Sequence, residues 1–223
     1  LIFDAATGNI LAILQGHGRS LRAAEFGPDG RWVVTGSDDG TAKVWDATTG
    51  KGLLTLRGHA GCVSSVAFDP TGRRIVTSSW DGTARTWDAS TGEVLLVLRS
   101  HEGQVHSAAF DPSGGRIATA SEDGTARIWD ASTGGKKVEL EKLATGRSQG
   151  LAFTPDSRLL ASPSEKGLVK VWSVSDGRLH ATLEDEGRAT AHVAFSPDGA
   201  LLAAGGTDGV VALWDVAKGV VVH

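Results

Sequence analysis

Histidine, serine and aspartate, the residue types of a nucleophilic catalytic triad, recur together at a fixed spacing along this sequence. Each group also contains a tryptophan, and the three complete groups are His17, Ser37, Asp39 and Trp45; His59, Ser79, Asp81 and Trp87; His101, Ser121, Asp123 and Trp129. In a hydrolase the serine would attack the substrate, with the histidine as its base and the aspartate orienting the histidine. An enzyme needs one such site, whereas this chain repeats the group three times. We therefore interpret the groups as structural and predict that the chain is not an enzyme.

The tryptophans of these groups belong to a repeat that runs through the whole chain. It is marked by five tryptophans that are 42, 42, 43 and 42 residues apart: Trp45, Trp87, Trp129, Trp172 and Trp214. Counting 42 residues back from the first of them reaches Phe3, which an aspartate follows. A repeat of about this length is one structural unit that buries its apolar faces against its neighbours.

Within each unit, short apolar runs alternate with turn residues. The runs are about four to seven residues long, alternate with a period of two and contain many β-branched residues, which predicts strands and not helices. Asp-Gly pairs, such as Asp39-Gly40 and Asp81-Gly82, separate two of the runs and indicate tight hairpin turns. Four runs fit in each unit. We therefore predict an all-β fold, a β-propeller of four-stranded antiparallel blades with five repeat units visible.

The landmarks of each unit resemble those of the WD-repeat family of β-propellers. They are a Gly-His or Ser-His pair, an Asp-Gly-Thr turn and a Trp-Asp pair, and the Asp-Ala-x-Thr-Gly sequence after the tryptophan is similar to bacterial members. The resemblance implies that the histidine, serine, aspartate and tryptophan of each group form a hydrogen-bonded chain inside one blade. The aspartate and the serine would each bond one nitrogen of the histidine ring.

The fourth and fifth units depart from this pattern. Their histidine positions hold Ala144 and Glu186, the fourth aspartate position holds Lys166, and the fifth serine position holds Gly206. We expect these two blades to be less rigid than the first three.

The repeat assigns residues 1–223 to a single propeller domain or to part of one. Residues 1–15 are predicted to supply the outer strand of a preceding blade, the repeat units end at the five tryptophans, and residues 216–223 form an incomplete outer strand. The sequence starts at Leu1 and contains no methionine, so we expect a segment of a larger protein. The expected whole is a larger ring of seven blades, which needs about 290 residues at this period. A closed five-bladed ring is the alternative.

The resemblance also implies where a partner would touch the blades. The two sets of positions lie at the start of the innermost strand and just before the aspartate of each group. They hold the candidate partner-binding residues Arg22, Ser64, His106, Gln149, Asp38, Trp80, Glu122 and Glu165. Trp80 lies outside the tryptophan period and is predicted to occupy an exposed turn, where a tryptophan suits a binding hot spot.

The composition limits the classes of partner and cofactor. The net charge is −4 without a cluster of basic residues, which argues against nucleic acid. No apolar run reaches the roughly 20 residues that span a bilayer, so we predict no membrane contact. Cys62 is the single cysteine and the histidine spacing fits no metal site, so we predict no metal and no cofactor. We expect a cytoplasmic location.

These observations favour a non-catalytic scaffold or sensor module that binds a protein or peptide. The resemblance to bacterial members makes an attached signalling or effector domain the expected context. One alternative is an enzyme with a site in the central channel, although the innermost runs are small and apolar and only Glu25 breaks that pattern. The other alternative is a purely structural repeat, or an assembly in which the open blade edges of separate chains pair by self-association.

Overall fold

The strands expected from the repeat are present in the computed structural model, which describes residues 1–140, 150–164, 168–184, 190–206 and 209–222. These residues form five four-stranded antiparallel sheets and one two-stranded sheet, without a helix. The all-β prediction and the four-stranded antiparallel blades are thereby confirmed. Within this part of the chain there is accordingly no helix long and apolar enough to cross a membrane.

In every sheet, strands that follow one another in the sequence pair side by side. The six sheets are β1 (Ile2–Phe3) and β2 (Ile10–Ala12); β3 (Leu21–Phe26), β4 (Trp32–Ser37), β5 (Ala42–Asp46) and β6 (Gly52–Leu56); β7 (Val63–Phe68), β8 (Arg74–Ser79), β9 (Thr83–Asp88) and β10 (Val94–Arg99); β11 (Val105–Phe110), β12 (Arg116–Ser121), β13 (Ala126–Asp130) and β14 (Lys136–Leu140); β15 (Ala152–Phe153), β16 (Leu159–Pro163), β17 (Val169–Ser173) and β18 (Leu179–Leu183); β19 (Thr190–Phe195), β20 (Leu201–Gly206), β21 (Val211–Asp215) and β22 (Val220–Val221).

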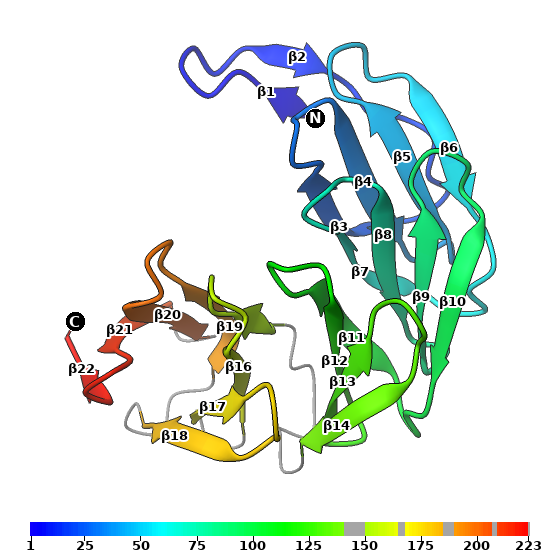
Figure 1. Cartoon of the computed structure of the whole chain (residues 1–223). Helices are drawn as coiled ribbons and strands as arrows, with labels where there is room; N and C mark the ends of the chain where they lie inside the picture. The colour runs from blue at the N-terminus through cyan, green and yellow to red at the C-terminus, as the bar shows by residue number, and fades with distance from the viewer. Residues whose placement is uncertain (141–149, 165–167, 185–189, 207–208, 223) are drawn as a thin grey trace.

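The sheets follow one another along an arc (Figure 1). The first strands of the sheets, among them β3, β7 and β11, line the inside of the arc, and the last strands, such as β6, β10 and β14, lie on its outside. The two-stranded β1–β2 sheet lies at one end of the arc and the β19–β22 sheet at the other. This arrangement places equivalent ends of the inner strands on the same face of the molecule.

The core consists of layers between neighbouring sheets. In the second four-stranded sheet, Val63 and Phe68 are 0% and 7% exposed, whereas Leu21 and Phe26 at the same repeat positions of the first sheet are both 53% exposed. The difference arises because, among the described residues, only the β1–β2 sheet packs on that side of the first sheet. Its Ile2 clusters with Val33 of β4 and Trp45 of β5, and no residue of β3 belongs to that cluster.

A chain of hydrogen bonds links a buried tryptophan to an aspartate in each of the first three four-stranded sheets. In the second of them, Trp87 Nε1 donates to Thr77 Oγ1 (2.9 Å), Thr77 Oγ1 lies 2.7 Å from His59 Nε2, and His59 Nδ1 lies 2.9 Å from Asp81 Oδ2. Because the hydroxyl accepts from the indole, its own proton points to Nε2, and the neutral histidine donates from Nδ1 to the aspartate. The chain ties the loop before β7 to the turn between β8 and β9. The first and third sheets repeat it through Thr35 and Thr119.

The hydroxyl in this chain belongs to a threonine, so the predicted role of the serine was wrong. The cause is the strand register: Trp87 pairs with Ile75, so the next residue on the same face of β8 is Thr77, while Ser79 lies a further two residues away at the turn.

The three predicted serines cap the turn instead. Each accepts a hydrogen bond from the backbone N–H of the aspartate two residues later, at 3.1 Å for Ser37 and Ser79 and 3.2 Å for Ser121. In the fourth sheet, Ser162 stands in the threonine's place and accepts from Trp172 Nε1 at 2.9 Å. The fourth sheet therefore keeps the tryptophan end of the hydrogen-bond chain. The predicted substitutions at residues 144 and 166 of the fourth unit and 186 of the fifth lie outside the described residues.

Two buried threonines of the second sheet provide a matched test of this chain. We predict that Thr77→Val lowers the free energy of unfolding by about 2 kcal/mol, because it leaves an indole N–H and a histidine nitrogen unsatisfied. Thr86 is also fully buried, but its hydroxyl has no hydrogen-bond partner among the described residues, and Val44 and Ile128 occupy its position in the neighbouring sheets. Thr86→Val should therefore raise the free energy of unfolding by about 1 kcal/mol. Urea denaturation measures both, and equal losses in the two variants would contradict the assignment.

Asp123 makes the free energy of unfolding depend on pH. Burial alone would raise the pKa of Asp123, but hydrogen bonds from Thr125, His101 and the backbone of Glu102 outweigh it and lower the pKa to about 2. A carboxyl with a lowered folded pKa stabilises the fold above its unfolded pKa, and that contribution is lost as the pH falls toward the folded pKa. We predict that Asp123→Asn is destabilising at about pH 6 and that the difference from the parent chain shrinks between about pH 4 and pH 2. A difference that stays constant in urea titrations over this range would refute the prediction.

Candidate functional site

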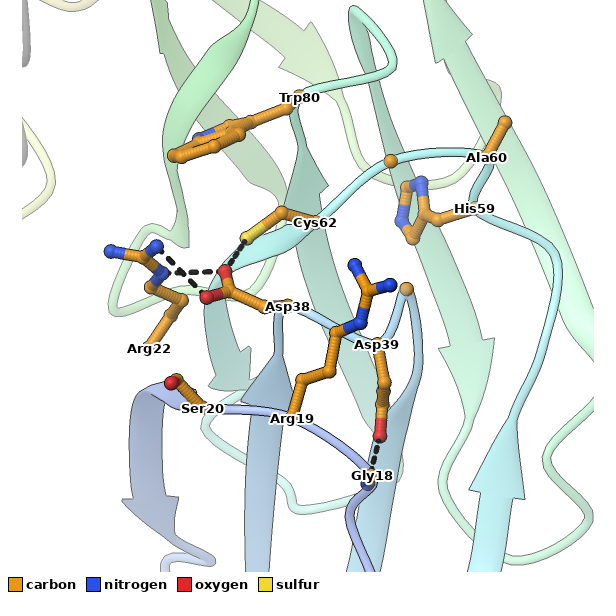
Figure 2. A pocket seen from close by; sticks show the side chains of 12 residues that line it. Gly18, Arg19, Ser20, Arg22, Asp38, Asp39, His59, Ala60, Cys62 and Trp80 are labelled. Carbon is orange, nitrogen blue, oxygen red and sulfur yellow. Dashed lines mark hydrogen bonds and ion pairs between the residues drawn. The ribbon is translucent and has the colours of Figure 1, made fainter.

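Three of the predicted partner-binding residues, Arg22, Asp38 and Trp80, line one cavity of about 890 Å³. Arg22 lies on β3, Asp38 in the turn between β4 and β5, and Trp80 in the turn between β8 and β9. Arg19 and Cys62 also line the cavity, and Figure 2 shows Arg22 and Cys62 converging on Asp38 beside the Trp80 ring. We call the cavity lined by these five residues the Trp80 pocket.

An ion pair forms one wall of the Trp80 pocket. Arg22 binds Asp38 with two hydrogen bonds, from Nε to Oδ1 (2.6 Å) and from Nη2 to Oδ2 (2.9 Å). Cys62 Sγ donates a third hydrogen bond to Asp38 Oδ1 at 2.9 Å. The hydrogen bonds from Arg22 and then Cys62 hold the pKa of Asp38 below its usual value. Two parallel bonds to a planar guanidinium orient both side chains, so this wall is preorganised.

Trp80 joins three sheets at this pocket. Its ring lies 5.2 Å from the Arg22 guanidinium of the first sheet and meets the His106 ring of the third sheet edge to face at 6.5 Å. The backbone N–H of Trp80 donates to the Cys62 carbonyl at 3.0 Å. These contacts leave Trp80 half-buried, so the prediction of an exposed turn residue overstated its exposure. The structure still presents part of the indole to the pocket.

Two other predicted residues, Ser64 and His106, do not line the Trp80 pocket. Ser64 Oγ bonds the Ser78 hydroxyl at 2.8 Å and donates to the Val105 carbonyl at 2.6 Å, which joins the second and third sheets. His106 is buried, with 5% of its surface exposed. Packing between sheets buries His106, so its expected surface exposure was wrong, whereas Ser64 is half-buried and its contact with a partner stays a prediction.

The remaining predicted residues lie apart from the pocket or outside the described part of the chain. Glu122 is exposed in the turn between β12 and β13 and does not line the pocket. Gln149 and Glu165 lie outside the described residues. Arg19 and Cys62 were missed by the sequence analysis, because both lie in loops before the inner strands, where strand alternation gives no signal.

The Trp80 pocket combines charged, hydrogen-bonding and aromatic groups. The pocket offers a paired guanidinium and carboxylate, an aromatic ring and the cation of Arg19, which forms no ion pair with the described carboxylates. The lining also contains a thiol, which could act as a nucleophile only as the thiolate. Burial, followed by the hydrogen bond to Asp38, raises the pKa of the Cys62 thiol to about 12. No group of three or more histidine, cysteine, aspartate or glutamate residues among those described could hold a metal ion.

The repeat is matched by a known family model, described as "WD domain, G-beta repeat". The matches cover residues 8–46, 50–88, 92–130, 145–173 and 177–215, which is most of the chain. Their boundaries follow the tryptophan period.

Two curated yeast proteins are similar to short parts of the chain. The ribosome biogenesis protein ERB1 of Debaryomyces hansenii is 48% identical over 33 residues, which is 15% of this chain and 4% of that protein. The U3 small nucleolar RNA-associated protein 21 of Saccharomyces cerevisiae is 38% identical over 45 residues, which is 20% of this chain and 5% of that protein. The similar segments thus span only a small part of either relative.

The raised pKa of the Cys62 thiol has a direct consequence for its reactivity. We predict that iodoacetamide alkylates Cys62 at about pH 8 at least a hundredfold more slowly than an unperturbed cysteine, because the thiolate is the reacting species. Intact-mass spectrometry of the folded chain over time measures the rate, and the same chain in urea supplies the unperturbed reference. Alkylation of the folded chain at the reference rate would show that the thiol is not held as the geometry indicates.

Proposed function

Because this chain belongs to the WD40 repeat family, we propose that it is a non-catalytic scaffold that binds another protein or peptide through the face carrying the Trp80 pocket. Repeats of this family serve as platforms for protein–protein interaction. The observation that carries the proposal is the convergence of Arg22, Asp38 and Trp80 from two sheets on one preorganised cavity. Trp and Arg are the residue types enriched in binding hot spots.

The charges of the Trp80 pocket favour one kind of partner side chain. Asp38 is neutralised by Arg22, and the second carboxylate of the lining, Asp39, is bonded to His17 and Thr41. Arg19 forms no ion pair with the described carboxylates, although its charge also lowers the pKa of Asp38. An acidic or neutral polar side chain of a peptide would meet Arg19 and stack against the exposed part of Trp80. The Arg22 to Asp38 pair would hold the pocket walls in place without being broken.

The wider setting of the scaffold remains a proposal. We propose a cytoplasmic protein in which the repeats carry a signalling or effector domain of a bacterial type, without nucleic acid or membrane as partners. The names of the two similar yeast proteins concern ribosome biogenesis and a small nucleolar RNA, so they lend no support to the bacterial setting. A segment of a larger, seven-bladed ring and the five-bladed ring both stay predictions.

Self-association is the second candidate function, since one observation favours it. Leu21 and Phe26 at one end of the arc and Val211 at the other are 53%, 53% and 63% exposed. Residues at the equivalent positions of the middle sheets are buried between neighbouring sheets. The exposed faces at the two ends of the arc could therefore pack against sheets of another protein molecule. The central-channel enzyme has no comparable observation in its favour.

Replacing Trp80 tests the proposed interaction face. We predict that Trp80→Ala lowers the recovery of bound proteins from a cell extract at least about tenfold, because truncating a central aromatic anchor removes about 2 kcal/mol or more of binding free energy. Quantitative mass spectrometry on the immobilised chain measures the recovery, and thermal unfolding verifies that the variant is folded. Leu95→Ala is the matched control, since Leu95 is an exposed apolar residue on the outer strand β10. Equal recovery with folded Trp80→Ala and parent chain would refute the proposal.

A further inference from the structure

A second cavity lies at the opposite end of the inner strands from the Trp80 pocket. Its volume is about 350 Å³, and it is lined by Glu25 and by the Phe-x-Pro turns that follow three inner strands: Phe26 to Pro28, Phe68 to Pro70 and Phe110 to Pro112. Arg22 of the Trp80 pocket lies near the start of β3, whereas Glu25 lies near its end. The two cavities therefore lie on opposite faces of the molecule, at opposite ends of the inner strands. We call this second one the Glu25 cavity.

Glu25 is the residue that distinguishes this cavity from a plain packing feature. Alanine occupies the same repeat position in the four other units, at residues 67, 109, 152 and 194. Glu25 Oε1 accepts a hydrogen bond from the backbone N–H of Phe68 at 2.9 Å, and no cationic side chain among the described residues pairs with its carboxylate. Burial raises the pKa of this carboxyl. Glu25 is an exposed residue, so an incoming cation can reach its carboxylate, and a nearby opposite charge favours the ionised form of a carboxyl.

The other carboxylates of the Glu25 cavity are already engaged. Asp69 accepts a hydrogen bond from Arg74 Nε at 3.0 Å, and Asp111 accepts one from Ser113 Oγ at 2.7 Å and one from the backbone N–H of Arg116 at 2.9 Å. Both aspartates are at most 2% exposed. Glu25 is therefore the carboxylate that an incoming cation would meet.

The aromatic rings of this cavity already accommodate one guanidinium. Arg74 places its guanidinium carbon 4.9 Å from the centroid of the Phe110 ring and donates to the Gly114 carbonyl at 2.6 Å. Phe68 and Phe110 are 7% and 9% exposed, so packing between sheets holds both rings in place while they line the cavity. A planar guanidinium stacks on aromatic surfaces and pairs with a carboxylate through two hydrogen bonds, which a lysine ammonium does not do as well.

We propose that the Glu25 cavity binds the side chain of an arginine from an extended peptide, with the guanidinium paired to the Glu25 carboxylate and packed against Phe68 and Phe110. The volume suits one long side chain, and three prolines add apolar surface to the lining. This site is separate from the Trp80 pocket, so it adds a second point of peptide recognition on the opposite face of the molecule.

The experiment is an NMR titration of the ¹⁵N-labelled chain with the peptide acetyl-Gly-Arg-Gly-amide. The amide of Phe68 donates to Glu25 and so reports on the cavity directly. The same peptide with citrulline in place of arginine keeps the shape and loses the charge. We expect saturable shifts of the Phe68 amide with the arginine peptide and a dissociation constant at least about tenfold weaker with the citrulline peptide.

Variants of Glu25 separate recognition from packing. Glu25→Gln keeps an acceptor for the Phe68 N–H and removes the charge, and Glu25→Ala installs the residue of the four other units, so both should fold. We expect either variant to weaken arginine-peptide binding at least about tenfold, and the matched Glu93→Gln, in the exposed turn between β9 and β10, to leave it unchanged. Equal binding of the two peptides, unchanged affinity in folded Glu25→Gln, or no saturable shift of the Phe68 amide in the parent chain would each overturn the proposal.

Discussion

The hydrogen-bond chain from a buried indole through a threonine and a histidine to an aspartate is the interaction on which the first three sheets depend. Its hydrogen bonds pair the indole N–H, the threonine hydroxyl and both nitrogens of the histidine ring, which fixes the neutral tautomer of the histidine. In the first sheet it ends at Asp39, whose Oδ2 also accepts from the backbone N–H of Gly18. That bond anchors the loop carrying Arg19 to the turn carrying Asp38. Asp39 and His59 of these networks also line the Trp80 pocket, so the networks help to hold its walls in place.

Both candidate sites arise where one repeat departs from the others. Trp80 stands where the neighbouring sheets have Asp38 and Glu122, and Glu25 stands where the other units have alanine. The repeated residues hold the sheets together and are nearly interchangeable between units. A residue that breaks the pattern without disturbing the packing is available to bind a ligand. The two departures lie in cavities at opposite ends of the inner strands.

Packing between sheets decided which of the candidate residues reach a partner. Arg22, Ser64 and His106 occupy the same repeat position, yet Arg22 is exposed, Ser64 bonds the neighbouring sheet and His106 is buried. Their exposure differs because β7 and β11 each lie beside a preceding sheet, whereas β3 has no such neighbour among the described residues. The period alone treats the three positions as equivalent and cannot express this difference.

The sequence by itself determined the strands, their antiparallel order within each sheet and the family, because these depend on local alternation, on tight Asp-Gly turns and on a period that recurs along the chain. It also identified Arg22, Asp38 and Trp80 as members of one face. Only the tertiary structure decided that Thr77 and not Ser79 joins the indole to the histidine, because that choice depends on the register of two strands. It also decided that Cys62 completes the Trp80 pocket and that Glu25 meets Phe68 and Phe110. Those contacts join side chains from different sheets, and their distances are set by how the sheets pack, which no short stretch of sequence records.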